Sequence, residues 1–213
     1  MLKLSRLQKS DDFDTALKTV RNALSLSDSI HYEFGKSEAL KIIADFDYDK
    51  HNFDKALSNY KKSIEIKEML KDDSGLAFCH RAVGCIYMKQ SEYKKAIENL
   101  FTSLEYYHKT GNFIESSGTL NNIGLVYTET KNYDKALEYL FNALETAEKS
   151  KNDYHIGKTL MNIGNTYKQM GNWQKALSFY QKSLQLENES NDPPGVAQCY
   201  NNIGNIYSQQ KKY

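Results

Sequence analysis

Apolar residues recur along the chain at helical spacing, in segments that short polar stretches interrupt at regular intervals. Leu120, Ile123, Gly124 and Tyr127 follow the i, i+3, i+4, i+7 pattern of one helical face. A second segment of the same kind begins at Tyr133, after a short polar break. The pattern therefore predicts pairs of amphipathic helices that are joined by short turns.

The helix pairs repeat with a period of 40 residues, and the register never slips. An aromatic-x-x-Ala motif occurs at Phe13, Phe53, Tyr93, Tyr133 and Trp173. A second motif, with a tyrosine three residues after a glycine, has its glycines at Gly84, Gly124, Gly164 and Gly204. Because a single helix pair cannot bury its apolar face alone, successive pairs must stack on a continuous core. We expect an all-α fold, an α-solenoid of antiparallel helix pairs that forms a right-handed superhelix.

The repeated glycines lie inside predicted helices, where glycine costs about 1 kcal/mol relative to alanine. Four such penalties at one position of the repeat need a structural reason. We expect close approach of the paired helix at this point, with the small Ala96, Ala136 and Ala176 lying opposite the glycines.

Together the two motifs resemble the tetratricopeptide repeat. The family's usual unit has about 34 residues, and 40-residue versions are found in kinesin light chains, spindle-orientation adaptors and bacterial peptide-sensing regulators. The second repeat departs from the pattern, with Ala44 in place of the glycine and Asp47 in place of the tyrosine. The resemblance implies a non-catalytic module that binds a protein or peptide in its concave groove.

The period also sets the domain organisation. We expect a single array over 1–213 that is truncated at both ends. Residues 1–9 resemble the end of a helix, and Tyr213 takes the place of the next repeat's first aromatic residue. The expected units cover approximately 1–31, 32–71, 72–111, 112–151, 152–191 and 192–213.

Composition narrows the class of partner. The chain has 28 Lys and Arg against 27 Asp and Glu, a net charge of +1, which argues against direct binding of nucleic acid or a membrane surface. It has no apolar run long enough to cross a membrane, and its first residues lack an apolar core of the length expected of a signal peptide. Its three cysteines form no disulfide framework. We expect a cytoplasmic protein.

Candidate chemistry is sparse. Cys79, His80 and Cys85 cluster on one predicted helix, but the two cysteines are on different faces and no second ligand pair is near. Cys79 occupies the position that Thr119 and Thr159 take in later units, so packing is the favoured interpretation. We expect no metal site, no cofactor and no catalytic residue.

The resemblance places the inward-facing residues at fixed distances from the repeated glycine, on the first helix of each unit. Many of them are amides, which can pair with both the N–H and the C=O of an extended peptide. The candidate peptide-binding residues are Asn121, Asn122, Asn162, Asn165, Asn202 and Asn205, with Arg81, Lys158 and Lys168 as charged contacts. The alternative is that these amides bond neighbouring helices and hold the stack in register.

Three classes of function remain open. The first is a peptide-binding or scaffold module, which is favoured. The second is the sensory input domain of a larger bacterial signalling protein, such as a kinase or a transcription regulator. The third is a structural or oligomerising spacer. The last helix would carry Val196, Tyr200, Ile203 and Tyr207 on an uncovered face, which predicts self-association there.

Overall fold

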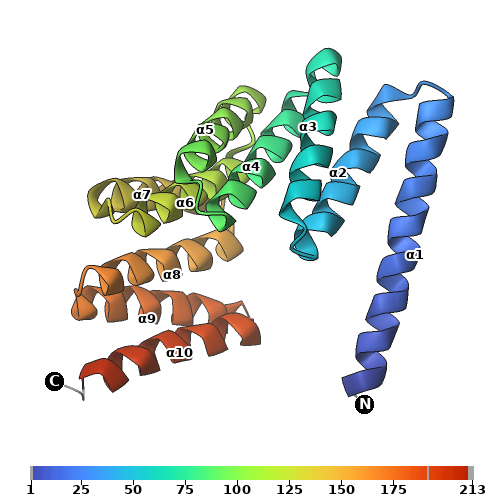
Figure 1. Ribbon diagram of the computed structural model, residues 1–213. Helices are drawn as coiled ribbons and strands as arrows, with labels where there is room; N and C mark the ends of the chain where they lie inside the picture. The colour runs from blue at the N-terminus through green and yellow to red at the C-terminus, as the bar shows by residue number, and fades with distance from the viewer. Residues whose placement is uncertain (1, 191, 211–213) are drawn as a thin grey trace. The chain divides into compact units, whose positions relative to one another are not determined.

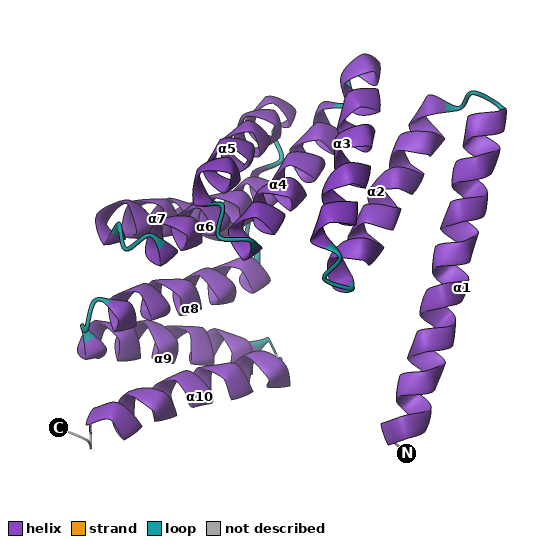
Figure 2. Ribbon diagram, viewed as in Figure 1, coloured by secondary structure: helices purple, strands orange, loops and turns teal. Residues whose placement is uncertain are grey.

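The computed structural model describes residues 2–190 and 192–210, with side chains from Phe13 onward. Within these residues every regular element is an α-helix (Figures 1 and 2). The helices are α1 (Leu2–Ser29), α2 (Glu33–Asp49), α3 (Phe53–Leu70), α4 (Asp73–Lys89), α5 (Tyr93–Thr110), α6 (Phe113–Glu129), α7 (Tyr133–Lys149), α8 (Asp153–Gln169), α9 (Trp173–Glu189) and α10 (Pro193–Gln210). The expectation for Tyr213 lies outside the described residues. An all-helical fold is confirmed.

The turns share one local design, which explains why the helices end where the polar breaks predict. The residue before the cap of the next helix has positive φ, and in five turns the cap side chain then accepts a backbone N–H three residues further on, which Tyr32 and Asn52 do not do. The positive-φ residues are His31, His51, Lys71, Ser91, Gly111, Lys131, Lys151 and Gly171. The accepting caps are Asp72, Asn112, Asn132, Asn152 and Asn172, at 2.9, 3.2, 3.4, 2.9 and 3.1 Å. Each such bond satisfies one of the free N–H groups at a helix start.

The first helix differs from the expectation. The sequence suggested the end of one helix over residues 1–9 and a new helix near Phe13, but α1 is continuous for 28 residues. The segment between them, Lys9-Ser10-Asp11-Asp12, contains neither glycine nor proline, so nothing in it forces a helix to end.

The chain divides into two compact units, up to Glu92 and from Tyr93 onward. In the first unit α2 packs against α1 and α3, and α3 packs against α4. Its core cluster comprises Ala44, Ala56, Tyr60, Cys79, Val83 and Ile86. In the second unit each consecutive pair of helices from α5 to α10 is in contact, and α8 also contacts α6 and α10. Its core cluster comprises Leu140, Met161, Ile163, Tyr167, Ala176, Tyr180, Cys199 and Ile206.

Close helix approach is confirmed at Gly124 and Gly164, whereas a Cβ on Gly204 would meet no atom within 4 Å. A Cβ on Gly124 would lie 2.6 Å from Leu140 Cγ and 3.2 Å from the carbonyl oxygen of Ala136. A Cβ on Gly164 would lie 2.6 Å from Cε1 of Tyr180. The closest group is therefore the large side chain one turn after the alanine, because the small alanine lets this side chain reach the glycine.

Candidate functional site

The candidate residues fall on both units. Arg81 lies on α4 in the first unit, half-buried, with its guanidinium carbon 5.7 Å from the centre of the Phe78 ring. The other eight lie on α6, α8 and α10 of the second unit. Because these three helices contact one another in sequence, the second unit brings its candidates onto one layer of helices.

Their accessibility differs. Asn205 and Lys158 are exposed, and Asn121 is buried with 2% of its surface accessible. The half-buried candidates are Asn122, Asn162, Asn165, Asn202 and Lys168. We call the accessible residues of this set (Asn122, Lys158, Asn162, Asn165, Lys168, Asn202 and Asn205) the amide face.

One pair of asparagines joins two helices. The Nδ2 of Asn162 on α8 donates a hydrogen bond of 3.0 Å to Oδ1 of Asn121 on α6. A buried amide is stable only when it is hydrogen-bonded, so this bond fixes both side chains. Asn121 is thus placed to position Asn162, while Asn162 keeps its own Oδ1 and its second Nδ2 hydrogen outside this bond.

A third asparagine is held from the opposite side. The hydroxyl of Tyr180 on α9 donates to Oδ1 of Asn165 over 2.7 Å. Burial, with the nearby Cys199, raises the pKa of Tyr180 to about 12, so the phenol stays protonated and remains a donor. The carbonyl end of Asn165 is therefore directed into the helix pair, and its NH2 group lies outside this bond.

Two further polar bridges follow the same interface between α6 and α8. Ser117 Oγ lies 2.6 Å from Nδ1 of His155, and Thr128 Oγ1 lies 2.9 Å from Oγ1 of Thr166. With the asparagine pair, they form a polar seam along the two helices. The sequence analysis offered amide bonds between helices as an alternative but missed the other two bridges, although small polar residues at buried positions of both helices were a usable signal.

The predicted packing role of Cys79 agrees with its surroundings. Its thiol is buried, and Sγ lies 3.8 Å from Oγ of Ser63. Burial raises the pKa of this thiol to about 11, which keeps it protonated. The equivalent residues Thr119, Thr159 and Cys199 are also buried. Over the described residues, no three His, Cys, Asp or Glu side chains are arranged to hold a metal ion.

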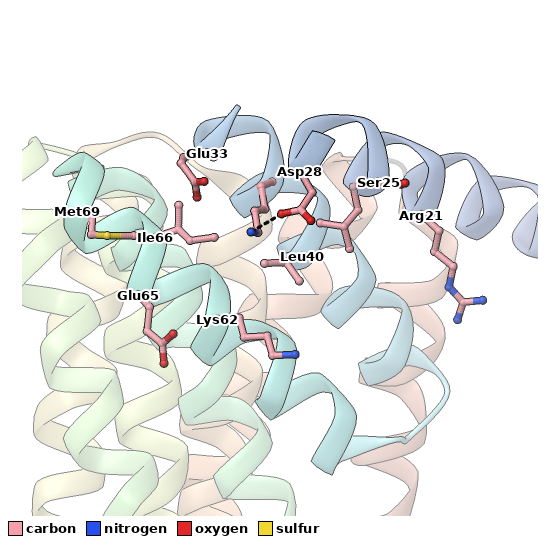
Figure 3. A pocket seen from close by; sticks show the side chains of 11 residues that line it. Arg21, Ser25, Asp28, Glu33, Leu40, Lys62, Glu65, Ile66 and Met69 are labelled. Carbon is pink, nitrogen blue, oxygen red and sulfur yellow. Dashed lines mark hydrogen bonds and ion pairs between the residues drawn. The ribbon is translucent and has the colours of Figure 1, made fainter. Parts of the chain in front are cut away.

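A separate hollow of ≈610 Å³ lies in the first unit, between α1, α2 and α3 (Figure 3). Its charged lining is balanced, with Arg21, Lys36 and Lys62 against Asp28, Glu33 and Glu65. Within this lining Lys36 Nζ lies 2.6 Å from Oδ1 of Asp28. Leu40 and Ile66 contribute apolar surface. Three helices must pack before this hollow exists, so the sequence pattern did not reveal it.

Sequence comparison identifies the repeats in the second half of the chain. A family model described as tetratricopeptide repeat matches residues 115–186 and 155–213. A model described as anaphase-promoting complex subunit 5 matches residues 80–115. The comparison with curated proteins found no match. None of the described helices combines the length and apolar content needed to cross a bilayer.

Solved structures extend the likeness to nearly the whole chain. The apo form of RapI matches with a TM-score of 0.81 at 22% identity, over 99% of this chain and 81% of that one. BtubC from P. vanneervenii matches with a TM-score of 0.78 at 18% identity, over 92% and 83%. A Rap protein complexed with competence and sporulation factor matches with a TM-score of 0.72 at 21% identity, over 85% of this chain and 50% of that one. Residues 115–213 are thus recognised by sequence as tetratricopeptide repeats, and the chain as a whole shares the α-solenoid fold of these solved structures.

Proposed function

We propose that the chain is a non-catalytic interaction module, which binds an extended segment of a partner protein or peptide on the amide face of the second unit. The observation that carries the proposal is the repetition of accessible amides at one register on α6, α8 and α10. Solvent-facing helix positions more often carry lysine or glutamate, whereas an amide can pair with both polar groups of a peptide backbone.

The hydrogen bonds of the amides support different tasks within this proposal. Asn162 and Asn165 are oriented by bonds to Asn121 and Tyr180, so they meet a ligand already ordered. Pre-ordering reduces the conformational entropy that is lost on binding. Asn202 and Asn205 extend the same register onto α10, and Lys158 and Lys168 supply positive charge on α8. An extended segment with an acidic group therefore fits this surface best.

The fold relatives support a binding role and give weight to one alternative. A Rap protein of the same fold was solved in complex with competence and sporulation factor, and this chain spans half the length of that protein. A sensory input domain of a larger bacterial signalling protein is therefore the second candidate. A structural spacer is the third, and the polar seam between α6 and α8 is the feature that favours it.

The test separates recognition from helix-to-helix bonding. A peptide array screened with the whole chain supplies a ligand, whose affinity is then measured by fluorescence polarisation for Asn162→Ala and Asn205→Ala. Each lost backbone hydrogen bond contributes about 1 kcal/mol, so each variant should bind about fivefold to tenfold more weakly. Asn205→Ala should leave the melting temperature unchanged, because Asn205 is exposed.

One result would refute the recognition role. If Asn162→Ala lowers the melting temperature by several degrees while both variants keep the wild-type affinity, the amides only hold the helices in register.

The expected self-association has its own support: Tyr200 and Tyr207 on α10 are 59% and 50% exposed. We propose that this face associates with a second copy; a monomer at high concentration by ultracentrifugation, with strong amide protection of α10, would contradict it.

A further inference from the structure

One position of the repeat is buried in every unit but differs in charge. It is the fifth residue before the cap of the following helix. Its occupants are Ser27, Lys67, Tyr107, Ala147 and Glu187, with exposed fractions of 8%, 0%, 3%, 0% and 9%. The first unit thus buries a cation where the second unit, at its α9–α10 corner, buries an acid.

The buried lysine of the first unit is fully compensated. Lys67 Nζ lies 2.5 Å from Oε1 of Glu38 and 2.8 Å from Oδ2 of Asp72. Asp72 is also the cap of α4, because its Oδ1 accepts the N–H of Gly75 over 2.9 Å. This corner is therefore a cation site, which the chain fills with its own ammonium group.

The α9–α10 corner has the same frame without the cation. Asp192 takes the place of Asp72, Gly195 takes the place of Gly75, and Glu187 takes the place of Lys67. A Cβ on Gly195 would lie 2.7 Å from Oε2 of Glu187 and 2.9 Å from Oδ2 of Asp192, so both carboxyl groups converge there. Among the described residues no basic side chain pairs with either one. Burial, followed by the charge of Asp192 and a hydrogen bond with it, raises the pKa of Glu187.

A hollow of ≈550 Å³ opens beside these two carboxyl groups. Its lining consists of Asp153, Tyr154, Leu186, Glu187, Glu189, Ser190 and Asp192, which are four acids and no base. This separates it from the balanced hollow of Figure 3. Tyr154 is 67% exposed and contributes an aromatic ring to the lining. An acidic hollow with an aromatic wall suits an organic cation.

Lys158 is the chain's own candidate cation, and its ammonium group lies over the Tyr154 ring rather than between the two carboxyl groups. Lys158 is the equivalent of Glu38, but its side chain is exposed, and its Nζ lies 5.7 Å from the centre of the Tyr154 ring. The described residues offer no three-ligand arrangement for a metal ion. We propose that this acidic hollow binds a basic side chain, lysine or arginine, of a partner protein, with its charged group against Glu187 and Asp192 and its stem along Tyr154.

The proposal is tested with a single side chain, so it stands or falls separately from the amide face. N-acetyl-arginine amide is titrated into the whole chain, and backbone amide shifts are followed by NMR. N-acetyl-citrulline amide, a neutral molecule of the same shape, is the matched ligand control. We expect saturable shifts at Tyr154, Glu187 and Gly195 with the arginine compound only. Equal shifts with citrulline would overturn the proposal.

Three variants identify the groups involved. Glu187→Gln should weaken arginine binding about tenfold or more, since it removes a charge-assisted hydrogen bond. Glu145→Gln removes an exposed carboxylate of the same unit and should change nothing. Lys158→Met should leave the affinity within about twofold; a tenfold gain would show that Lys158 fills the hollow itself and would refute a guest site.

The last variant fills the hollow with a lysine side chain of the protein itself. Glu187→Lys rebuilds the arrangement of Lys67 with Asp72, so it should abolish arginine binding and raise the melting temperature. Should repulsion from Lys158 prevent folding, adding Lys158→Glu restores the complete charge set of the first unit. Arginine shifts of wild-type size in the folded variant would overturn the proposal.

Discussion

Replacing Lys67 with methionine tests how much the buried cation stabilises the first unit. The change keeps a long unbranched side chain but removes the ammonium group. It leaves Glu38 with its second ion pair, to Lys41, and takes from Asp72 the ammonium group of Lys67. The side chains of Glu38 and Asp72 remain 31% and 23% exposed, so water reaches both carboxylates in part.

The size of the effect follows from this partial burial. Removing one partner of a fully buried ion pair destabilises a protein by about 3–5 kcal/mol. Because water screens both carboxylates here, we expect a smaller loss of about 2–3 kcal/mol in the free energy of unfolding. In a chain of this size the melting temperature should fall by about 4–12 °C.

The pH dependence has a definite sign. Burial opposes the charge on all three groups, but the hydrogen bonds from Lys67 outweigh it. They raise the pKa of Lys67 and, together with a bond from Lys41 to Glu38 and a backbone N–H to Asp72, lower the pKa values of both carboxylates. The carboxylate contribution is complete above about pH 4 and is lost as the pH falls through their lowered native pKa values. The lysine contribution is complete below about pH 10 and is lost as the pH rises through its raised native pKa. The difference between wild type and Lys67→Met should therefore form a plateau between these limits and shrink outside them.

Urea unfolding followed by far-ultraviolet circular dichroism measures the difference, with Lys62→Met on the same helix as the exposed control. Hydrogen exchange at the Gly75 amide, which donates to Asp72, reports on the first unit directly. If the two variants differ by less than about 0.5 kcal/mol, a surface-like effect, the reasoning about buried compensation is refuted.

The repeat supplies two more predictions. Gly164→Ala should destabilise the second unit, because its Cβ would lie 2.6 Å from the buried Tyr180 ring. Gly204→Ala should instead stabilise α10 by about 1 kcal/mol, because the added Cβ meets no atom within 4 Å. Thermal unfolding of the two variants checks this, and equal effects would contradict it. Cys79, buried and with its thiol pKa raised to about 11, should react with iodoacetamide far more slowly than the half-buried Cys85, as peptide mapping by mass spectrometry would show; equal labelling in the native state would contradict this.

Much of the fold was predictable because its information is local. The break at Lys131-Asn132 encodes both a turn and a helix cap, and the same pair of positions recurs in each repeat. The close approach at Gly164 was also predictable, since a glycine inside a helix needs a steric reason. Its partner, Tyr180, was not, because which side chain reaches the glycine depends on how the two helices pack.

The candidate site was harder to predict from the sequence. An asparagine such as Asn162 looks the same in sequence whether it faces a ligand or a neighbouring helix, and only the packing of α6 on α8 places it against Asn121. Lys67 shows the same limit. A lysine near the end of a helix is ordinarily solvated, and its burial follows from the two carboxylates that α2 and the next turn bring to it.

The left-handed turn residues give the chain unused capacity for stabilisation. Of the eight described positions with positive φ, only Gly111 and Gly171 are glycine, although all eight lie directly before the cap of the next helix. A side chain in this conformation costs about 1 kcal/mol, a penalty that glycine avoids. Copying glycine from one repeat into another is thus a consensus edit with an internal precedent. Lys131 and Lys151, both exposed, are the natural first sites, and successive edits would raise thermal tolerance without altering any helix face.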